Sequence, residues 1–269
     1  MDTEDGTESA LAGKHIYGDG FSPDEIEAWY ESEREGYSGL GASDRAGYRY
    51  GYHALNQRHG FRHLGNRPIE HALGLGSAYG DEFLPISERI SRLTIVDPSD
   101  HFVSTRVHGI PTEYAKPSPE GRLPFEDDSF DLVCALGVLH HIPNVSFVAT
   151  ELKRVCRPGG LALIREPIVS MGDWRKPRRG LTRNERGIPL SLFRGAIEEA
   201  GFVIEAESLC VFPPLVKAVQ KAGISTFNSG VFTRLDEIVA RLFRFNYRYH
   251  ALSTLERFRP SSAFYVVRG

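Results

Sequence analysis

The sequence predicts an α/β protein built on a doubly wound, mainly parallel sheet. Short apolar segments alternate with helix-like segments from residue 68 to about residue 213, as parallel strands and their crossover helices do. One of them, FDLVCALGVL, is almost wholly apolar, as expected of a strand buried on both faces. A turn with Gly74, Gly76 and Gly80 follows the first predicted strand. Because glycines let a ligand approach the backbone, we expect a nucleotide at the carboxyl edge of the sheet.

Composition limits the remaining classes of protein. The chain has 269 residues, 41% hydrophobic, enough for one full domain with additions, and its net charge of -3 argues against non-specific nucleic-acid binding. Cys134, Cys156 and Cys210 are far apart, so we expect no metal site, no disulfide and a cytoplasmic setting. The acidic N-terminus has no apolar segment, and no apolar run reaches the ~20 residues of a membrane span. We expect the first dozen residues to be disordered.

Residues 1–66 are predicted to form a tail and an aromatic-rich helical cap. Six of the eleven tyrosines lie between residues 17 and 52. A helix should begin at SPDE, where Ser22 can cap and Glu25 can complete a capping box, and end before Gly36. A second helix is expected over residues 52–64. The cap makes Tyr30 a candidate substrate contact.

The predicted core comprises residues 67–213 and 260–269. Its strands are expected at HALGLG, RLTIVDP, PTEYAKPS, FDLVCALGVL, LALIREP, VIEAESLCVF and SAFYVVRG. Its helices are expected at DEFLPISERI, NVSFVATELKRV and IPLSLFRGAIEEAG. Asn144 is the expected N-cap of the second of these helices.

Residues 214–259 are an insertion between the last two strands. Its second half, residues 233–250, has the period of a helix. The apolar face of that helix comprises Leu235, Ile238, Val239 and Leu242, and the other side carries Arg234, Arg241, Arg244 and Arg248. The helix either packs on the sheet or serves as a lid or a homodimer element.

The middle of the chain closely resembles class I S-adenosylmethionine-dependent methyltransferases. The motifs LPF, DSFD, LHHIPN and RPGG occur in order within residues 121–160, and the resemblance runs from about residue 72 to residue 166. The nearest group is the small-molecule one that includes the ubiquinone and menaquinone biosynthesis methyltransferases. The resemblance implies a Rossmann-like sheet of seven strands with an antiparallel last strand, and S-adenosyl-L-methionine as cofactor.

The resemblance also implies which residues bind the cofactor. Gly76 and Gly80 would line its methionine and ribose, and Asp97, 21 residues after Gly76, would bind the ribose hydroxyls. Leu136 and Gly137 would flank the sulfonium. The full predicted set is Gly74, Gly76, Ser77, Gly80, Asp97, Glu120, Leu136 and Gly137.

The chain departs from the family pattern at two places. The glycine turn of the family usually begins with an acidic residue, but Gly74 stands there, and Ala78 replaces the middle glycine. An acidic residue often precedes LPF to reach the adenine amine. Pro119 falls at that position, so Glu120 or a backbone carbonyl would have to take this role.

Three side chains are candidates for catalysis. A sulfonium is already an activated electrophile, so the protein must mainly align the nucleophile, and a base is needed only if the nucleophile holds a proton. His140 and His141 are the candidate bases, and His140 would face the methyl group or the substrate. Glu166 could be a base or a substrate contact. The alternatives are a histidine bonded to backbone and a Glu166–arginine salt bridge.

The segment 170–187 follows the fifth core strand and should overhang the site. It has six basic residues, and Arg175, Arg178 and Arg179 with Trp174 are candidate substrate contacts. Arginine binds phosphate or carboxylate well, which favours a polar, anionic acceptor; the alternative is a solvated loop.

These observations predict methyl transfer to oxygen or nitrogen of a sugar, a nucleotide-linked sugar or a secondary metabolite. One alternative is an NAD(P)-dependent oxidoreductase, although no Tyr-x-x-x-Lys pair follows the fourth strand. The other alternative is a non-catalytic partner protein that binds an adenosine ligand.

Overall fold

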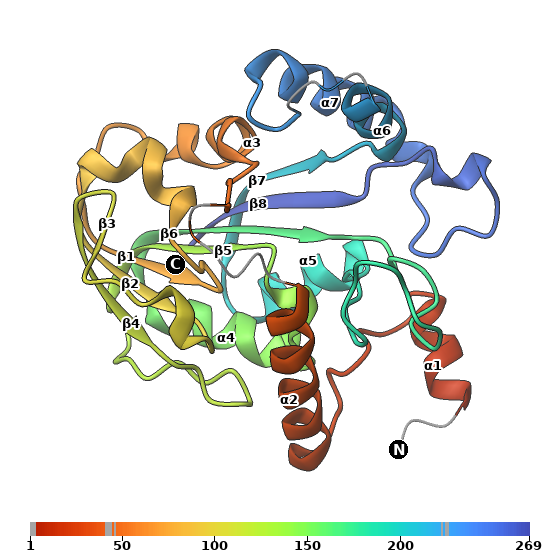
Figure 1. The fold of residues 1–269 in the computed structure, drawn as a ribbon, viewed down its shortest axis with the longest axis horizontal. Helices are drawn as coiled ribbons and strands as arrows, with labels where there is room; N and C mark the ends of the chain where they lie inside the picture. Colours follow the sequence, from red (N-terminus) through yellow and green to blue (C-terminus); the bar gives the residue numbers. More distant parts are fainter. Residues whose placement is uncertain (1–3, 41–44, 46, 222, 224–225) are drawn as a thin grey trace.

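The computed structural model describes the chain except for residues 1–3, 41–44, 46, 222 and 224–225. One sheet runs through its centre, with helices on both faces (Figure 1). The strands are β1 (Ile69–Leu75), β2 (Ile90–Val96), β3 (Arg106–Val107), β4 (Ile110–Ala115), β5 (Phe130–Leu136), β6 (Cys156–Pro167), β7 (Val203–Cys210) and β8 (Ser262–Arg268). Their order in the sheet is β3-β4-β2-β1-β5-β6-β8-β7.

The pairing confirms the predicted fold class. Strands β4, β2, β1, β5 and β6 pair in parallel, while β8 lies antiparallel between β6 and β7. The sheet has eight strands instead of seven because the two-residue β3 pairs with β4 as a hairpin. His108 and Gly109 connect them with φ of 50° and 84°, the left-handed conformations that a two-residue hairpin turn requires.

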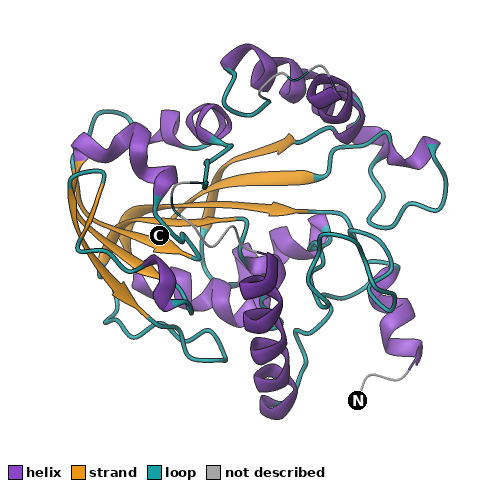
Figure 2. Ribbon diagram, in the orientation of Figure 1, coloured by secondary structure: helices purple, strands orange, loops and turns teal. Residues whose placement is uncertain are grey.

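The helices form the outer layers of the fold (Figure 2). They are α1 (Glu4–Leu11), α2 (Pro23–Leu40), α3 (His53–His59), α4 (Val145–Val155), α5 (Leu190–Glu199), α6 (Pro213–Lys221) and α7 (Gly230–Leu242). The 3-10 turns are η1 (Phe61–Leu64), η2 (Asp81–Arg89), η3 (Asp100–Phe102), η4 (Leu139–His141), η5 (Arg244–Asn246) and η6 (Leu255–Arg257). Helices α4 and α5 lie on one side of the sheet, and α3, α6 and α7 lie on the other (Figure 1).

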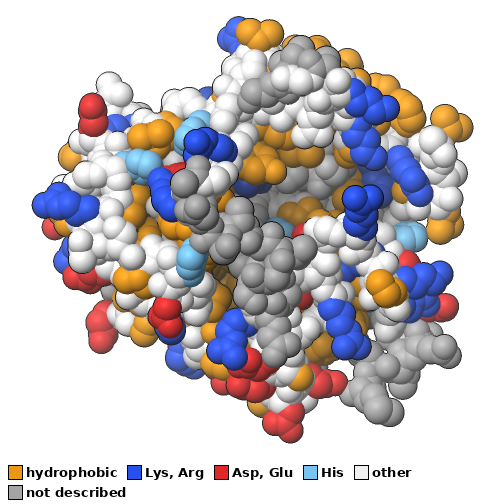
Figure 3. Space-filling model, in the orientation of Figure 1, with side chains coloured by type: hydrophobic (Ala, Val, Ile, Leu, Met, Phe, Trp, Pro, Cys, Tyr) orange, Lys and Arg blue, Asp and Glu red, His pale blue; other side chains and the backbone are white. Residues whose placement is uncertain are grey.

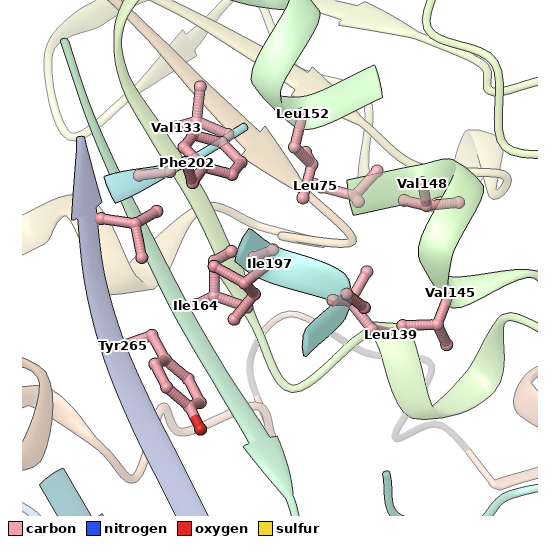
Figure 4. Packing of buried hydrophobic residues seen from close by; sticks show 14 of the residues in the cluster. Leu75, Val133, Leu139, Val145, Val148, Leu152, Ile164, Ile197, Phe202 and Tyr265 are labelled. Atoms are coloured by element: carbon pink, nitrogen blue, oxygen red, sulfur yellow. The ribbon is translucent and has the colours of Figure 1, made fainter. Parts of the chain in front are cut away.

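The core on the α4–α5 side shows why these segments fold as predicted. Val145, Val148 and Leu152, spaced three and four residues apart on α4, point toward the strands (Figure 4). They meet Val133 of β5, which is fully buried. Leu132 of the same strand belongs to the cluster on the opposite face. Strand β5 is therefore buried on both faces, as its apolar sequence predicts.

The N-terminal segment is more ordered than expected. The prediction of disorder is wrong from Glu4 onward, because α1 forms and buries Leu11 against Trp174 and Tyr249. Helix α2 begins with the predicted capping box: Ser22 N donates to Glu25 Oε2 at 2.9 Å, and Glu25 N donates to Ser22 Oγ at 3.4 Å. It continues to Leu40, past its predicted end.

Two local predictions in the core are wrong. Segment 81–89 forms the 3-10 turn η2 and not an α-helix; Pro85 lies inside it and has no N–H to donate. Asn144 precedes α4, but its side chain makes no cap bond and donates to Glu120 O at 2.6 Å. Instead Asp19 accepts the N–H of Ser146 at 2.9 Å, so a residue of the N-terminal segment caps α4.

The insertion also differs from expectation. Helix α7 ends at Leu242, and η5 and η6 follow it. The predicted apolar face does not pack on the sheet: Leu235, Ile238 and Leu242 are exposed, while Asp236 on the other side is fully buried. None of the helices in the described ranges is both long and apolar enough to cross a membrane.

Candidate active site

The predicted cofactor residues meet at one edge of the sheet. Gly76 follows β1, Asp97 follows β2 and Gly137 follows β5, and the ends of neighbouring parallel strands lie together. Gly76 N donates to Val96 O at 2.8 Å, and Gly137 N donates to Arg165 O at 2.7 Å. These bonds hold the loops that leave β1 and β5 against the strands beside them.

The glycine turn needs left-handed backbone at several positions. Gly76 and Gly80 have φ of 62° and 69°. A Cβ on Gly76 would lie 2.3 Å from Val138, so only glycine lets this loop approach the one after β5. Ala78, where the family has a glycine, also has a positive φ of 46°. The turn is thus left-handed at Gly76, Ala78 and Gly80, and Ala78 is the strained residue among them.

Asp97 is held in a fixed orientation beside this turn. Its Oδ2 accepts the N–H of Ala78 at 3.2 Å, and its Oδ1 accepts the N–H of Ser99 at 2.9 Å. Burial raises the pKa of its carboxyl group, but both oxygens remain acceptors. Asp97 also borders a hollow lined by Ser99, Tyr114 and Lys116. This arrangement suits a ligand with a diol.

Glu82 is a residue that the sequence pattern did not single out. A side chain at Gly74 would collide with Ser77, because a Cβ there would lie 2.2 Å from Ser77 Oγ. Glu82, in the first turn of η2, is buried nearby, and its charge acts on Cys134, the partner of Gly74 in β5. Burial raises the pKa of Glu82 to about 7. A buried carboxyl group therefore lies close to the position where the family has an acidic residue.

His140 lies in a buried pair of carboxylates. Its Nδ1 is 2.6 Å from Glu166 Oε2, and its Nε2 is 3.6 Å from Glu185 Oε1. Burial alone would lower the pKa of His140, but the charge of Glu166 and the bonds to both carboxylates raise it to about 9. His140 is therefore an imidazolium at neutral pH. Glu166 also accepts the N–H groups of Val138 and Leu139, both at 2.8 Å, and so fixes the loop after β5.

His141 has the opposite protonation state. Burial and the neighbouring His140 charge lower its pKa, so its ring is neutral at pH 7. Its Nδ1 lies 2.9 Å from Glu33 Oε2, and the two histidine rings are 4.1 Å apart. Glu33 comes from α2 and also accepts the hydroxyl of Thr182 at 2.6 Å. Helix α2 thus contributes Glu33 to the site, a residue that no motif in the sequence singled out.

His140, His141 and Glu185 form a cluster that their spacing in the sequence did not suggest. One ligand atom of each lies within 4.8 Å of the others, a grouping that could hold a metal ion. The imidazolium of His140 already lies between the carboxylates of Glu166 and Glu185. We therefore interpret the cluster as an ion-pair network.

Arg186 fixes the loop after β5 that carries His140 and His141. Its side chain is fully buried and donates to five backbone carbonyl oxygens, those of Tyr17, Leu139, His140, Ile142 and Pro143. Its guanidinium also lies 5.0 Å from the ring centroid of Trp29. This arginine belongs to the basic segment 170–187, but its role is to fix the loop and not to bind an anion.

The other predicted substrate contacts of this segment are mostly engaged elsewhere. Arg178 donates to the carbonyl oxygens of Met171, Thr182 and Arg183 within its own loop. Arg175 pairs with Asp173, and Trp174 is buried against α1. Arg179 is exposed, and the described residues show no contact that holds its side chain within the loop.

Tyr30 lies in α2, and Glu120 lies in the loop between β4 and β5. Burial raises the pKa of Tyr30, and Asp97 is among the charges that act on it, which places it toward the cofactor edge. The carboxyl group of Glu120 is exposed, and a bond with Ser118 lowers its pKa. Their assignments as substrate and cofactor contacts stay predictions.

Comparisons with known proteins indicate the type of domain to which this segment is similar. Residues 73–164 match the family model described as a methyltransferase domain. A ubiquinone biosynthesis O-methyltransferase of Rhizobium etli is 28% identical over 105 residues, 36% of this chain and 42% of that protein. A demethylmenaquinone methyltransferase of Roseiflexus castenholzii is 28% identical over 112 residues, 38% of this chain and 44% of that protein.

Solved structures share the fold at low identity. An S-adenosylmethionine-dependent methyltransferase of Mesorhizobium loti has a TM-score of 0.50 and 15% identity, covering 76% of this chain and 92% of that one. The cyclase SpnF has a TM-score of 0.57 and 16% identity, covering 88% of this chain and 96% of that one. The second likeness shows that the fold alone does not decide the reaction.

Together the sheet order, the glycine turn and the matched segment define a nucleotide-binding α/β domain of the methyltransferase type. Residues 73–164 match a methyltransferase domain, and this match implies S-adenosyl-L-methionine as the cofactor. The two alignments with relatives cover less than half of this chain and less than half of each relative.

Proposed function

We propose that the protein transfers the methyl group of S-adenosylmethionine to an oxygen or nitrogen atom of a polar small molecule. The observation that carries the proposal is the histidine pair that follows β5 at the edge where Asp97 lies, with His140 bonded to Glu166 and His141 bonded to Glu33. The bound cofactor supplies an activated methyl group. Asp97 suits its ribose hydroxyl groups, and Glu82 suits its ammonium group. The glycine turn lets it come close to the backbone.

The two histidines have different roles in this proposal. His140, with a pKa of about 9, holds its proton at neutral pH and cannot serve as the resting base. It keeps Glu166 and Glu185 in place. His141 is neutral, and when its Nδ1–H donates to Glu33 the lone pair lies on Nε2. His141 therefore accepts the proton of the acceptor hydroxyl, in place of the base His140 expected from the motif.

The acceptor is a hydroxyl compound such as a sugar, a nucleotide-linked sugar or a secondary metabolite. The name of the Rhizobium etli relative, an O-methyltransferase, supports oxygen as the atom methylated. The structure gives less support to an anionic acceptor, because Arg178 and Arg186 bond to backbone carbonyls. Arg179 and Arg183, both exposed, are the remaining cations of that loop for such a group.

The test is the turnover of His141→Ala. We expect kcat to fall by about 10²–10⁴ with cofactor affinity unchanged, because a general base contributes to the chemical step alone. S-adenosylhomocysteine formation over a panel of phenolic and sugar hydroxyl acceptors is the measurement. His15→Ala, which changes an exposed histidine, is the control. A loss below tenfold would mean that the site acts by positioning alone.

The other two functions make different predictions. An NAD(P)-dependent oxidoreductase would give heat on titration with NAD and none with S-adenosylmethionine. A non-catalytic adenosine-ligand binder would bind S-adenosylmethionine but form no methylated product with any acceptor of the panel. Calorimetry together with the product assay therefore separates all three.

A further inference from the structure

Helix α7 exposes the apolar side chains of Leu235, Ile238 and Leu242, while its inner side buries Phe232 and Ala240 together with the polar Asp236. Asp236 points inward, where its carboxylate accepts the N–H groups of Val211 at 2.7 Å and Phe212 at 2.8 Å, beyond the end of β7. Thr233, on the same side, is also fully buried. These contacts fix the rotation of the helix. Leu235, Ile238 and Leu242, which the sequence pattern predicts to be buried, therefore face solvent.

The exposed apolar surface continues beyond the helix. Asn246 of η5 donates through its Nδ2 to Leu255 O at 2.9 Å and Phe258 O at 2.8 Å, which joins the two turns after α7. We call the combined surface the outer apolar face; it comprises Val231, Leu235, Ile238, Leu242, Phe245, Leu252, Leu255 and Phe258. Eight of the twelve exposed large hydrophobic side chains of the described residues lie in it, so the apolar exposure is concentrated on one short segment.

Three strongly exposed side chains of this face lie in the segment that follows α7. Phe245 in η5 is 79% exposed, Leu252 is 86% exposed and Leu255 in η6 is 79% exposed. The segment that carries them projects from the body of the molecule beyond α7 (Figure 1). Projecting apolar side chains of this kind can insert into the boundary between lipid headgroups and acyl chains.

The same segment is strongly basic. Residues 213–259 contain eight lysines and arginines and three acidic residues, a net charge of +5 in a chain whose total is -3. The acidic side chains are engaged: Asp236 is buried, Glu237 pairs with Arg58, and Glu256 accepts the N–H groups of Leu252 and Ser253. The exposed cations are Lys217, Lys221, Arg234, Arg241, Arg244, Arg248 and Arg257. Figure 3 shows basic and hydrophobic side chains together along this rim.

We propose that the outer apolar face docks the protein on an anionic lipid surface. Basic side chains beside exposed leucines and phenylalanines are the chemistry of helices that lie in the membrane interface, where cations meet anionic headgroups and apolar tips enter the acyl boundary. A second copy of the chain fits less well. A two-fold interface would bring the same row of arginines from both copies together.

The proposed docking face is joined to the candidate active site. Tyr247, just after η5, donates its hydroxyl to Ile168 O at 2.7 Å, and Tyr249 donates its hydroxyl to Gly187 O at 2.7 Å. These carbonyls lie on either side of the loop that overhangs the histidine pair. The molecule is hollowed between the α6–α7 segment and α2 (Figure 3). Docking would therefore bring this hollow next to the headgroup region.

Vesicle sedimentation with the full chain tests the proposal and does not depend on catalytic activity. We expect binding to vesicles that contain phosphatidylglycerol, weak binding to phosphatidylcholine alone, and a loss of binding as salt is raised. Phe245→Ser with Leu252→Ser should reduce the bound fraction at least tenfold. Arg234→Glu with Arg241→Glu should remove the preference for anionic vesicles.

Matched controls come from exposed apolar side chains elsewhere. Val203 is 65% exposed and Leu84 is 47% exposed, so Val203→Ser with Leu84→Ser removes two apolar groups outside the face and should leave binding unchanged. All these side chains are on the surface, and unchanged circular dichroism would show that each variant folds.

Three results would overturn the proposal. The first is wild-type protein that stays in the supernatant with both kinds of vesicle. The second is equal binding of the wild type and the Phe245/Leu252 variant. The third is a concentration-dependent dimer in analytical ultracentrifugation that the same variant abolishes while vesicle binding is absent, which would assign the face to a second copy.

Discussion

At the scale of single residues, the cofactor edge holds two buried carboxyl groups with different surroundings. Asp97 accepts two backbone N–H groups, which hold its carboxyl group in one orientation. Glu82 has its pKa raised by burial to about 7, so a large part of it is protonated in the free protein near neutral pH. A bound ammonium group would favour the ionised form. Glu82 should therefore act as an acidic contact whose strength depends on pH.

We expect Glu82→Gln to weaken S-adenosylmethionine binding by about 1.5–3 kcal/mol, the range for a hydrogen bond to a charged group. Wild-type affinity should increase as pH rises through about 7, where Glu82 ionises, and the variant should lose that dependence. Calorimetry at several pH values measures both effects. Asp97→Ala should weaken binding by a similar amount without removing the pH dependence, and an unchanged pH profile in Glu82→Gln would refute the assignment.

The ion pair between His140 and Glu166 should make stability depend on pH. The pKa of His140 is raised to about 9, so its contribution is complete below its ordinary value of 6.5 and is lost as pH rises through 9. Burial would raise the pKa of Glu166, but the charge of His140 holds it below 4.5, so that contribution is lost only as pH falls below this value. Both contributions are present between about pH 4.5 and 6.5.

Urea unfolding at pH 6 and at pH 9.5 should therefore show a loss of about 3 kcal/mol in the wild type, the size of a shift of about two pKa units or slightly more. His140→Gln cannot titrate and should lose much less over the same interval, whatever its starting stability. An equal loss of unfolding free energy in the two proteins would show that groups other than His140 cause the loss of stability at alkaline pH.

At the scale of elements, helix α4 depends on a residue more than a hundred positions away. The carboxylate of Asp19 accepts the N–H of Ser146 in the first turn of α4, whereas the side chain of Asn144 makes no cap bond. Asp19→Ala should cost about 0.5–2 kcal/mol in unfolding free energy, the range for loss of an N-cap. Asp19→Asn keeps an acceptor oxygen and should retain most of the stability. Denaturant unfolding of both variants is the measurement, and equal stability of all three proteins would contradict the role.

Local pattern was enough to predict most elements of the fold. The alternation of apolar segments placed the seven long strands, and Ser22 with Glu25 marked the start of α2. It failed where a distant partner decides the outcome. The apolar stripe of α7 suggested burial, but Asp236 turns inward to bond the backbone beyond β7, and that contact cannot be read from the helix alone.

Some residues of the candidate site could be predicted from the sequence, and others could not. The motif around His140 and the acid at Asp97 were found because their spacing is local to strand ends. Glu33 and Glu185 were missed, since each reaches the histidines from a different segment. The roles of the two histidines also depend on these carboxylates, so the sequence could name both rings but not their protonation states.

At the scale of the whole molecule, cofactor binding should stabilise the fold. A ligand that binds only the folded state adds about 2.7 kcal/mol at a hundred times its dissociation constant. For a chain of this size that is a rise in Tm of about 5–10 °C. Differential scanning fluorimetry should show the rise with S-adenosylmethionine and no shift with NAD or NADP. A shift with the nicotinamide cofactors alone would support the oxidoreductase alternative.

The bond between Glu33 and Thr182 has a consequence for the synthesis of the chain. The two residues are 149 positions apart, and Arg186, which binds Tyr17 O, is 169 positions from it. A ribosome adding about 5–20 residues per second needs roughly 7–35 s to supply these partners. Throughout that interval Trp29 and its neighbouring tyrosines have no completed protein surface to cover them. The N-terminal cap is thus made before the segments that bury it, and we expect its aromatic side chains to stay uncovered in the nascent chain until residue 186 has been added.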